Sequence, residues 1–214
     1  GDDIKTIVTN AEVYRLAWAP DSKELGVVGY ANSRLTIYDA QKGSEVNKFA
    51  NPKGIELWSA SYSPDGSLIA IGDGATPSNV YVFDAQSGAE VAGPLQSRGA
   101  SWDIEFSPDG QYLTTCNGSG TVYTWTTSDW KVYDALSGDG IHPDGCKDGV
   151  FGVNSDIYIS VGTDGVLNVW DMSSGDLLFT ESFGVNITTV SISGDGELIA
   201  VALSDGTVRV MGLE

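Results

Sequence analysis

The segment "FSPDGQYL" (residues 106–113) has two related copies upstream, "YSPDGSL" (62–68) and "WAPDSKEL" (18–25). Each copy places an aromatic and a small residue before Pro-Asp, and an apolar run after the turn. Pro-Asp-Gly favours a tight turn, because Pro presets φ and Gly tolerates the positive φ that follows. The copies are 44 residues apart, measured at their aspartates Asp21, Asp65 and Asp109. This spacing indicates repeated structural units rather than a reaction motif.

Two diverged copies extend the repeat, with aspartates at Asp156 and Asp195. A second marker ends a later apolar run of each unit, as in "LTIYDA" (35–40) and "LNVWDM" (167–172). Its aromatic or Met position recurs at spacings of 45, 42, 45 and 41 residues, at Tyr38, Phe83, Trp125, Trp170 and Met211. Five units of about 43 residues therefore fill the chain as a single domain.

Each unit consists of short apolar runs separated by turn residues. The last unit contains "TTVSIS" (188–193), "LIAVAL" (198–203) and "TVRVM" (207–211), the latter two separated by Ser-Asp-Gly, a hairpin signal. A weaker fourth run follows in most units, as in "EVNKFA" (45–50). We find no sustained helical periodicity. Four short antiparallel strands cannot bury both sheet faces alone, so the units must stack face to face.

The period, the "SPDG" turn and the pair Trp170-Asp171 resemble WD40 repeats, whose units are the blades of a β-propeller. The resemblance implies an all-β fold of four-stranded antiparallel blades and a non-enzymatic protein-binding role. The repeats span about 11–50, 55–96, 100–136, 147–182 and 185–214. No "GH" dipeptide opens any repeat. We therefore expect no blade to form the His–Ser/Thr–Trp hydrogen-bond chain found in many blades of this family.

The segment "IKTIVT" (4–9) resembles a fourth strand, whereas the last unit ends after its third. We expect this N-terminal strand to complete the last blade and to close a ring of five blades. Two alternatives remain. The chain is part of a larger propeller whose other blades are absent or lie on another chain, or strand 4–9 completes a neighbour's blade in a head-to-tail assembly.

The chain has a net charge of −18, from 29 acidic and 11 basic residues. That field repels phosphate backbones and anionic lipid headgroups, so nucleic acid and membrane surfaces are not expected partners. On charge alone a protein partner with a basic surface is favoured, although the acids also serve solubility. No apolar run reaches the roughly 20 residues of a membrane helix.

The chain lacks the residue patterns of catalytic and cofactor sites. It has one histidine, His142, and no nucleophile elbow or phosphate-binding loop. The insertion "SGDGIHPDGCKDG" (137–149) gathers His142, Cys146, Asp139, Asp144 and Asp148, but its spacing matches no zinc or calcium pattern. We interpret it as a solvated loop. We expect no enzyme, no metal and no cofactor.

An aromatic residue stands seven positions before the turn aspartate in the first three units, at Tyr14, Trp58 and Trp102. In a propeller this register lies at the start of the innermost strand, by the mouth of the central channel. Aromatic residues are frequent in binding hot spots, so we propose a partner-binding face here. The alternative is burial between blades. Burial between blades is expected for Trp18, Tyr62 and Phe106.

The remaining aspartates and the cysteines have simpler interpretations. Turn formation explains the aspartates of the second-to-third strand turns and of the "YD", "FD" and "WD" pairs, among them Asp73, Asp164 and Asp205. Cys116 and Cys146 are expected on the same side of neighbouring blades, where either a disulfide or two free thiols is compatible with the spacing.

Two triplets, at Asn117 and Asn186, fit the N-glycosylation acceptor pattern. The family resemblance favours an intracellular location. The two triplets and the start at Gly1 keep a secreted, processed chain as the alternative.

The favoured function is a scaffold that recognises a protein or peptide through Tyr14, Trp58 and Trp102. One alternative is a structural subunit of a head-to-tail or filamentous assembly. The other is a carbohydrate-binding propeller, because Trp faces stack on sugars.

Overall fold

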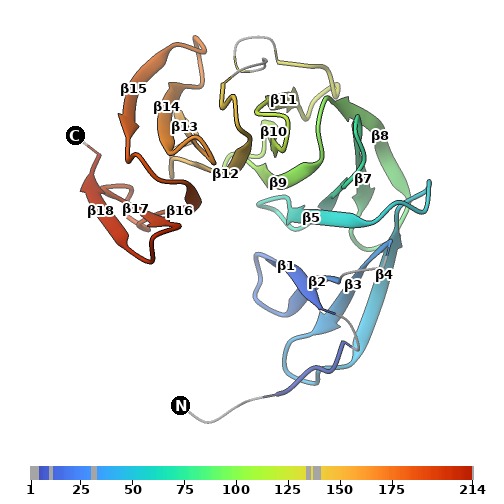
Figure 1. The fold of residues 1–214 in the computed structure, drawn as a ribbon. Helices are drawn as coiled ribbons and strands as arrows, with labels where there is room; N and C mark the ends of the chain where they lie inside the picture. Colours follow the sequence, from blue (N-terminus) through green and yellow to red (C-terminus); the bar gives the residue numbers. More distant parts are fainter. Residues whose placement is uncertain (1–4, 10–11, 30–32, 134–135, 137–140, 214) are drawn as a thin grey trace.

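A computed structural model describes residues 5–9, 12–29, 33–133, 136 and 141–213. These residues contain eighteen strands in five antiparallel sheets, arranged along an arc in chain order (Figure 1). Within each sheet consecutive strands are hydrogen-bonded neighbours. The all-β class and the repeated antiparallel sheets predicted from the sequence are confirmed, but the third and fifth sheets contain three described strands instead of the predicted four.

The first sheet contains β1 (Val13–Trp18), β2 (Glu24–Gly29), β3 (Arg34–Asp39) and β4 (Glu45–Ala50). The second contains β5 (Leu57–Tyr62), β6 (Leu68–Asp73), β7 (Ser78–Asp84) and β8 (Glu90–Ser97). The third contains β9 (Ser101–Phe106), β10 (Tyr112–Asn117) and β11 (Val122–Thr126). The fourth contains β12 (Cys146–Phe151), β13 (Ile157–Gly162), β14 (Val166–Asp171) and β15 (Leu177–Ser182). The fifth contains β16 (Ile187–Ile192), β17 (Leu198–Leu203) and β18 (Val208–Gly212).

The "SPDG" segments form the turns between the first two strands of a sheet. In the second sheet the Asp65 carboxylate accepts hydrogen bonds from the Ser63 hydroxyl, at 2.6 Å, and from the Ser67 backbone N–H, at 3.0 Å. Gly66 closes the turn with φ of 73°, which a residue with a side chain rarely adopts. Local turn chemistry therefore explains why the motif recurs once per sheet.

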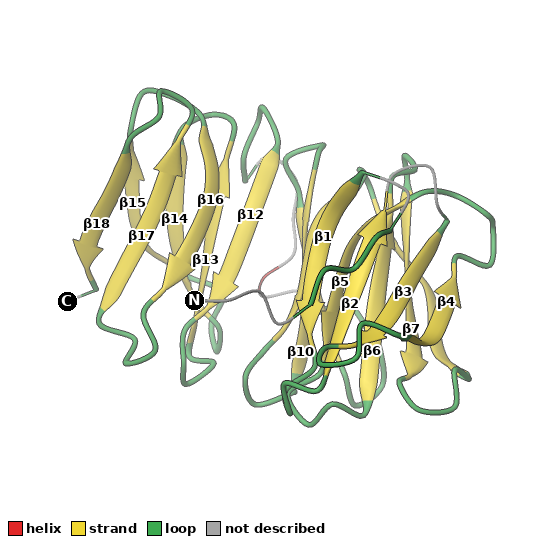
Figure 2. Cartoon of the chain, turned by 90° about the horizontal axis from the view of Figure 1, so that it is seen from below, coloured by secondary structure: helices red, strands yellow, loops and turns green. Residues whose placement is uncertain are grey.

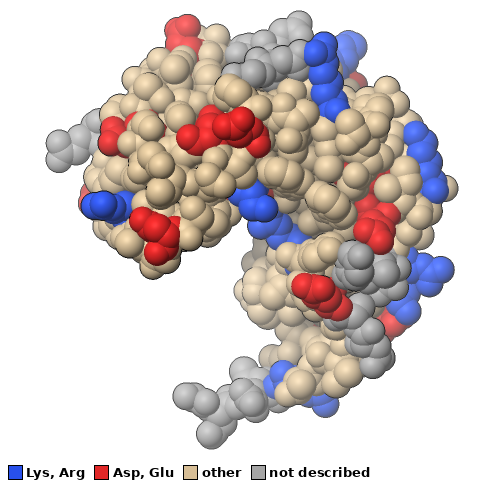
Figure 3. Space-filling view, in the orientation of Figure 1, with Lys and Arg blue, Asp and Glu red and all other residues tan. Residues whose placement is uncertain are grey.

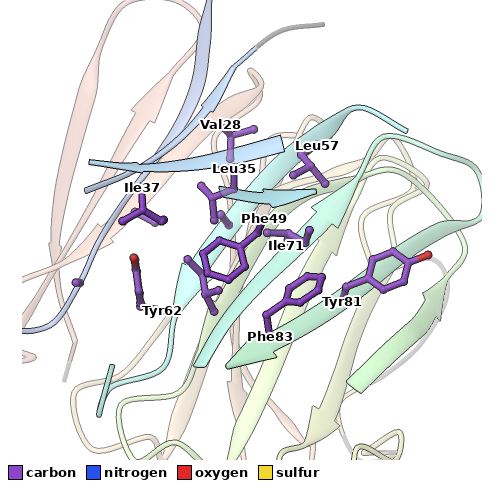
Figure 4. Packing of buried hydrophobic residues seen from close by; sticks show 13 residues of the cluster. Val28, Leu35, Ile37, Phe49, Leu57, Tyr62, Ile71, Tyr81 and Phe83 are labelled. Carbon is purple, nitrogen blue, oxygen red and sulfur yellow. The ribbon is translucent and has the colours of Figure 1, made fainter. Parts of the chain in front are cut away.

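Neighbouring sheets face each other across apolar layers (Figure 2). Between the first two sheets, Leu35 and Ile37 of β3 pack against Leu57 and Tyr62 of β5 (Figure 4). A similar cluster joins the second and third sheets, and another joins the fourth and fifth. Each sheet thus obtains a buried face from its neighbours rather than from its own strands.

The expected ring closure is wrong for this structure. Residues 5–9 form no strand, and the side chain of Lys5 lies against Gly43, in the turn between β3 and β4. They therefore lie by the first sheet, at the opposite end of the arc from β18 (Figure 1). Ile4 lies outside the described residues. The angle between neighbouring sheets, repeated over five sheets, leaves the arc open.

One prediction about the core, the burial of Trp18 between sheets, is also wrong. Tyr62 and Phe106 are buried between sheets as expected, but Trp18 is 57% exposed. The three residues share one register, so the difference comes from what covers them. In this structure no described sheet packs on the face of the first sheet that is turned away from the second sheet (Figure 1).

This contrast gives a matched test of inter-sheet packing. We expect Tyr62→Ala to lower the free energy of unfolding by about 3–5 kcal/mol, since it leaves a cavity between two sheets. Trp18→Ala should change it by less than about 1 kcal/mol, because the side chain is exposed. Urea titration of both variants measures the two values. Equal losses would contradict the assigned stacking.

Candidate functional site

The start of the inner strands forms a pocket at the centre of the arc. It has a volume of about 460 Å³ and is lined by Tyr14, Arg15, Trp58, Trp102, Lys147, Asp148, Thr188 and Thr189. The structure thus brings the three predicted aromatic residues together. It adds Lys147 and Thr188, which occupy the same register in the fourth and fifth sheets. We call these residues the mouth pocket.

The aromatic rings are held by close packing. Tyr14 and Trp58 meet edge to face, with centroids 6.4 Å apart. The Trp58 ring lies on Gly74 and the Trp102 ring lies on Gly118, so closely that a Cβ at either glycine would come within 2.6 or 2.8 Å of the ring. The buried Trp58 indole N–H has no acceptor among the described residues, so packing alone orients this ring.

An ionic cluster beneath the mouth pocket joins four of the five sheets. The Arg15 guanidinium of β1 donates to the Asp103 carboxylate of β9 at 2.6 Å and lies 3.8 Å from Asp148 of β12. Asp148 in turn accepts hydrogen bonds from the Thr189 hydroxyl and the Val190 N–H of β16. Arg15 therefore supplies the positive charge that two buried carboxylates share.

Burial governs the protonation of this cluster. It raises the pKa of Asp103 to about 7, the neighbouring Asp148 charge adds to the rise, and Arg15 opposes it. Burial also raises the pKa of Glu105 well above its usual range, although the Phe151 N–H donates to its carboxylate at 3.1 Å. The carboxyl groups of Asp103 and Glu105 thus resist ionisation near neutral pH.

The lining of the mouth pocket carries two cations, Arg15 and Lys147, against the single anion Asp148. The Lys147 ammonium lies 4.8 Å from the Trp102 ring centroid, in a cation–π contact. Figure 3 shows Lys and Arg atoms along the inner edge of the arc. This local charge does not favour the basic partner expected from the net charge. Arg15 and Lys147 were not among the site residues predicted from the sequence, although their place in the repeat register could have indicated both.

The fourth sheet contains the polar chain that the sequence analysis excluded. The His142 Nε2 lies 2.9 Å from the Ser160 hydroxyl, which accepts the Trp170 indole N–H at 3.0 Å. The other ring nitrogen, Nδ1, donates to the Asp164 carboxylate at 3.1 Å. The prediction failed because it required histidine directly after glycine, whereas "GIH" (140–142) places one residue between them.

His142 is accordingly a buried structural residue, not part of a solvated loop. Burial lowers its pKa, against the opposing effect of Asp164, so the ring is neutral at pH 7. Equivalent contacts join neighbouring sheets with other side chains. Asn51 donates to Asp73 at 3.2 Å, and the Ser97 hydroxyl donates to Asn117 at 2.9 Å.

Two known protein families match segments of this sequence. The family described as "Eukaryotic translation initiation factor eIF2A" matches residues 1–131, and "WD domain, G-beta repeat" matches residues 177–210. The chain is a WD-repeat protein of the eIF2A family.

Curated relatives of this WD-repeat protein have varied names. Meiotic recombination protein rec14 of Schizosaccharomyces pombe is 25% identical over 122 residues, covering 56% of this chain and 38% of rec14. Ciliary WD repeat-containing protein ctxp80 of Euplotoides octocarinatus is 27% identical over 184 residues, covering 86% of this chain and 23% of ctxp80. Serine-threonine kinase receptor-associated protein of Bos taurus is 26% identical over 131 residues, covering 61% of this chain and 36% of that protein. The chain therefore spans well under half the length of these relatives.

The two glycosylation triplets differ in the folded WD-repeat chain. Asn117 is wrong as an acceptor, because its side chain is fully buried and its amide donates to Thr115 and Thr121. Asn186 is exposed, in the segment before β16, so its triplet stays a prediction.

The two cysteines form a disulfide, Cys116–Cys146, which joins β10 of the third sheet to β12 of the fourth.

The described residues contain no group of three or more His, Cys, Asp or Glu side chains suited to a metal ion. Asp139, an acidic residue of the insertion 137–149, lies outside the part of the chain that the structure describes. No described segment forms a helix long and apolar enough to span a membrane.

Most of the remaining aspartates serve turns. Asp164 and Asp205 each accept the backbone N–H of the residue two positions later. Asp39, Asp84 and Asp171 of the "YD", "FD" and "WD" pairs do the same. Asp73 accepts such a bond and is also fully buried against Asn79.

The contribution of the His142 hydrogen bonds to stability can be tested with two substitutions of different size. We expect His142→Ala to lower the free energy of unfolding by about 2–4 kcal/mol, because Asp164 and Ser160 lose buried hydrogen bonds. His142→Asn should lose less, since Asn51 makes the equivalent contact to the second sheet. Denaturant titration with Asn186→Ala as an exposed control measures this. Similar stability for the Ala variant and wild type would refute the structural role.

The ionic cluster predicts a pH dependence. The raised pKa of Asp103 means that the folded protein retains a proton that the unfolded chain has lost above pH 4. This contribution to stability is full below about pH 4 and is lost as the pH rises to about 7. Asp103→Asn cannot ionise, so its stability relative to wild type should rise across that window, by about 1.4 kcal/mol per pKa unit at most. Urea titrations at several pH values measure the difference, and a flat difference would contradict the assignment.

Proposed function

We propose that this WD-repeat protein is a non-enzymatic scaffold that binds a protein partner at the mouth pocket. The single observation that carries the proposal is the convergence of Tyr14, Trp58 and Trp102, from three different sheets, on one pocket. Aromatic side chains in a concave surface supply large contact area at small entropic cost. The names of the WD-repeat relatives are consistent with regulatory or scaffold roles.

The charges of the mouth pocket support a more specific proposal for the chemistry of the partner. Lys147 is exposed and already covers the Trp102 face, so a second cation at that ring would meet a like charge. Arg15 is the counter-ion of Asp103. We therefore expect a peptide segment that places an apolar or aromatic side chain beside a carboxylate, the carboxylate reaching Lys147.

Peptide selection gives a test that needs no known partner. A phage-displayed library of random peptides is selected on the wild-type protein, and affinities of the enriched peptides are measured by fluorescence anisotropy. Trp58→Ala and Trp102→Ala should each weaken binding at least tenfold, the size expected of a hot-spot residue. Lys147→Glu should weaken acidic peptides, and wild-type affinity for them should fall with added salt.

Phe179→Ala is the matched control, because Phe179 is an exposed aromatic residue on β15, outside the mouth pocket. Circular dichroism checks that each variant is folded. Peptides that bind the two Trp variants as tightly as wild type would refute the assigned site. Enrichment of basic peptides would refute the proposed partner chemistry while leaving the site intact.

A further inference from the structure

Arg15 borders two cavities at the centre of the arc. It lines the mouth pocket and also a second cavity of about 340 Å³, whose lining includes Asp103 and Glu105. One nitrogen of its guanidinium, Nη2, donates to the Asp103 carboxylate at 2.6 Å and to the Trp102 carbonyl oxygen at 3.0 Å. The Arg15 side chain is 32% exposed. A single cation therefore belongs both to the surface that meets a partner and to the ionic cluster beneath it.

The charged groups around Arg15 come from the strands that line the two cavities, namely β1, β5, β9, β12 and β16. β9 supplies Asp103 and Glu105, and β12 supplies Lys147 and Asp148. β5 and β16 contain no Asp, Glu, His, Lys or Arg, and β1 contains no charged residue besides Arg15. Three carboxyl groups and two cations therefore set the charge at the centre of the arc.

Asp103 is the member of this cluster whose charge changes close to neutral pH. Burial and a neighbouring carboxylate raise its pKa to about 7, although the guanidinium beside it opposes the rise. The phenol groups of Tyr62 and Tyr158 stay neutral, because burial raises the pKa of both. His142 stays neutral at pH 7, because burial lowers its pKa. Near pH 7 a charge is therefore gained or lost directly beside the cation that lines the mouth pocket.

The charge state of Asp103 determines the charge beneath the mouth pocket. When Asp103 and Asp148 are both ionised, two negative charges lie 2.6 and 3.8 Å from one guanidinium, and the excess repels a carboxylate in the pocket. When Asp103 is neutral, Arg15 balances Asp148 alone, and the Lys147 charge attracts the carboxylate unopposed. We propose that Asp103 regulates the affinity of the mouth pocket for an acidic partner, with Arg15 as the link. The inference rests on the proposed function and adds a regulation of the same site.

Binding of an acidic partner is accompanied by proton uptake in this arrangement. The partner's carboxylate raises the pKa of Asp103 above its value of about 7 in the free protein. By linkage, the affinity is constant below about pH 7 and falls as the pH rises from there to the pKa of the complex. Each unit of that pKa rise corresponds to an affinity loss of about tenfold. The partner is therefore bound more tightly in mildly acidic than in mildly alkaline solution.

Peptide affinities measured across this pH range test the coupling. The probes are an acidic peptide enriched on the wild-type protein and the same peptide with each carboxylate replaced by its amide, both without histidine and with blocked termini. In fluorescence anisotropy, affinity for the acidic peptide should fall about tenfold between pH 7 and 9, and affinity for the amide peptide should change less than about twofold. Isothermal titration calorimetry in phosphate and in Tris, whose ionisation enthalpies differ, should show proton uptake for the acidic peptide alone.

Three substitutions assign the titrating group. Asp103→Asn fixes the neutral state, so it should remove the pH dependence and retain the affinity that wild type has below pH 7. Glu105→Gln should leave the dependence in place, because Glu105 lines the second cavity and not the mouth pocket. Glu181→Gln is the matched control, since it removes an exposed carboxylate on β15, and it should behave as wild type does. Circular dichroism checks that each variant is folded.

A wild-type affinity for the acidic peptide that does not change with pH would overturn the proposal, and this measurement needs no variant. A dependence that Asp103→Asn retains, or that Glu105→Gln abolishes, would also overturn it. In each of these cases the proposed function stands if Trp58→Ala and Trp102→Ala still weaken binding. Acidic peptides that bind both Trp variants as tightly as wild type would instead overturn the proposed function, and this inference with it.

Discussion

Stacking of one sheet face on the next is the interaction on which the rest of this protein depends. A lone three- or four-stranded sheet of such short strands buries too little apolar surface to be stable, at roughly 25 cal/mol per Å². Stacking supplies the missing burial at Leu35, Leu57, Leu167 and Ile187 alike, all of which are fully buried. Stacking also sets the angle between neighbouring sheets, and hence the position of each sheet's first strand around the centre of the arc.

Polar contacts between and within the sheets make that stacking specific. His142, Asn51 and Ser97 each satisfy a buried polar group of a neighbouring turn. Arg15 links the first sheet to the third and fourth through two carboxylates. Because an unpaired buried charge is costly, these contacts penalise arrangements in which the sheets are displaced along the arc.

The same geometry produces the mouth pocket and the exposed faces at the two ends of the arc. The first strands of the sheets converge at the centre of the arc. Residues that are 44 or 45 positions apart in the sequence therefore become neighbours in the mouth pocket, as Trp58, Trp102 and Lys147 do. At the ends of the arc the stacking stops, and residues that would be buried inside, such as Leu16 and Val210, remain exposed. The mouth pocket and the exposed end faces are thus separate consequences of one repeated unit.

The amino-acid sequence alone determined the strands, the turns and their period, because these depend on local chemistry such as the Pro-Asp-Gly turn and β-branched alternation. It also placed Tyr14, Trp58 and Trp102 in one register. Tertiary structure decided what no local pattern encodes: whether the arc closes, whether Trp18 is covered, and which side chains meet. Arg15 and Asp103 are 88 positions apart, and His142 reaches Ser160 and Asp164 from a different strand. Such contacts follow from the angle at which sheets stack, which is a property of whole faces rather than of any single segment.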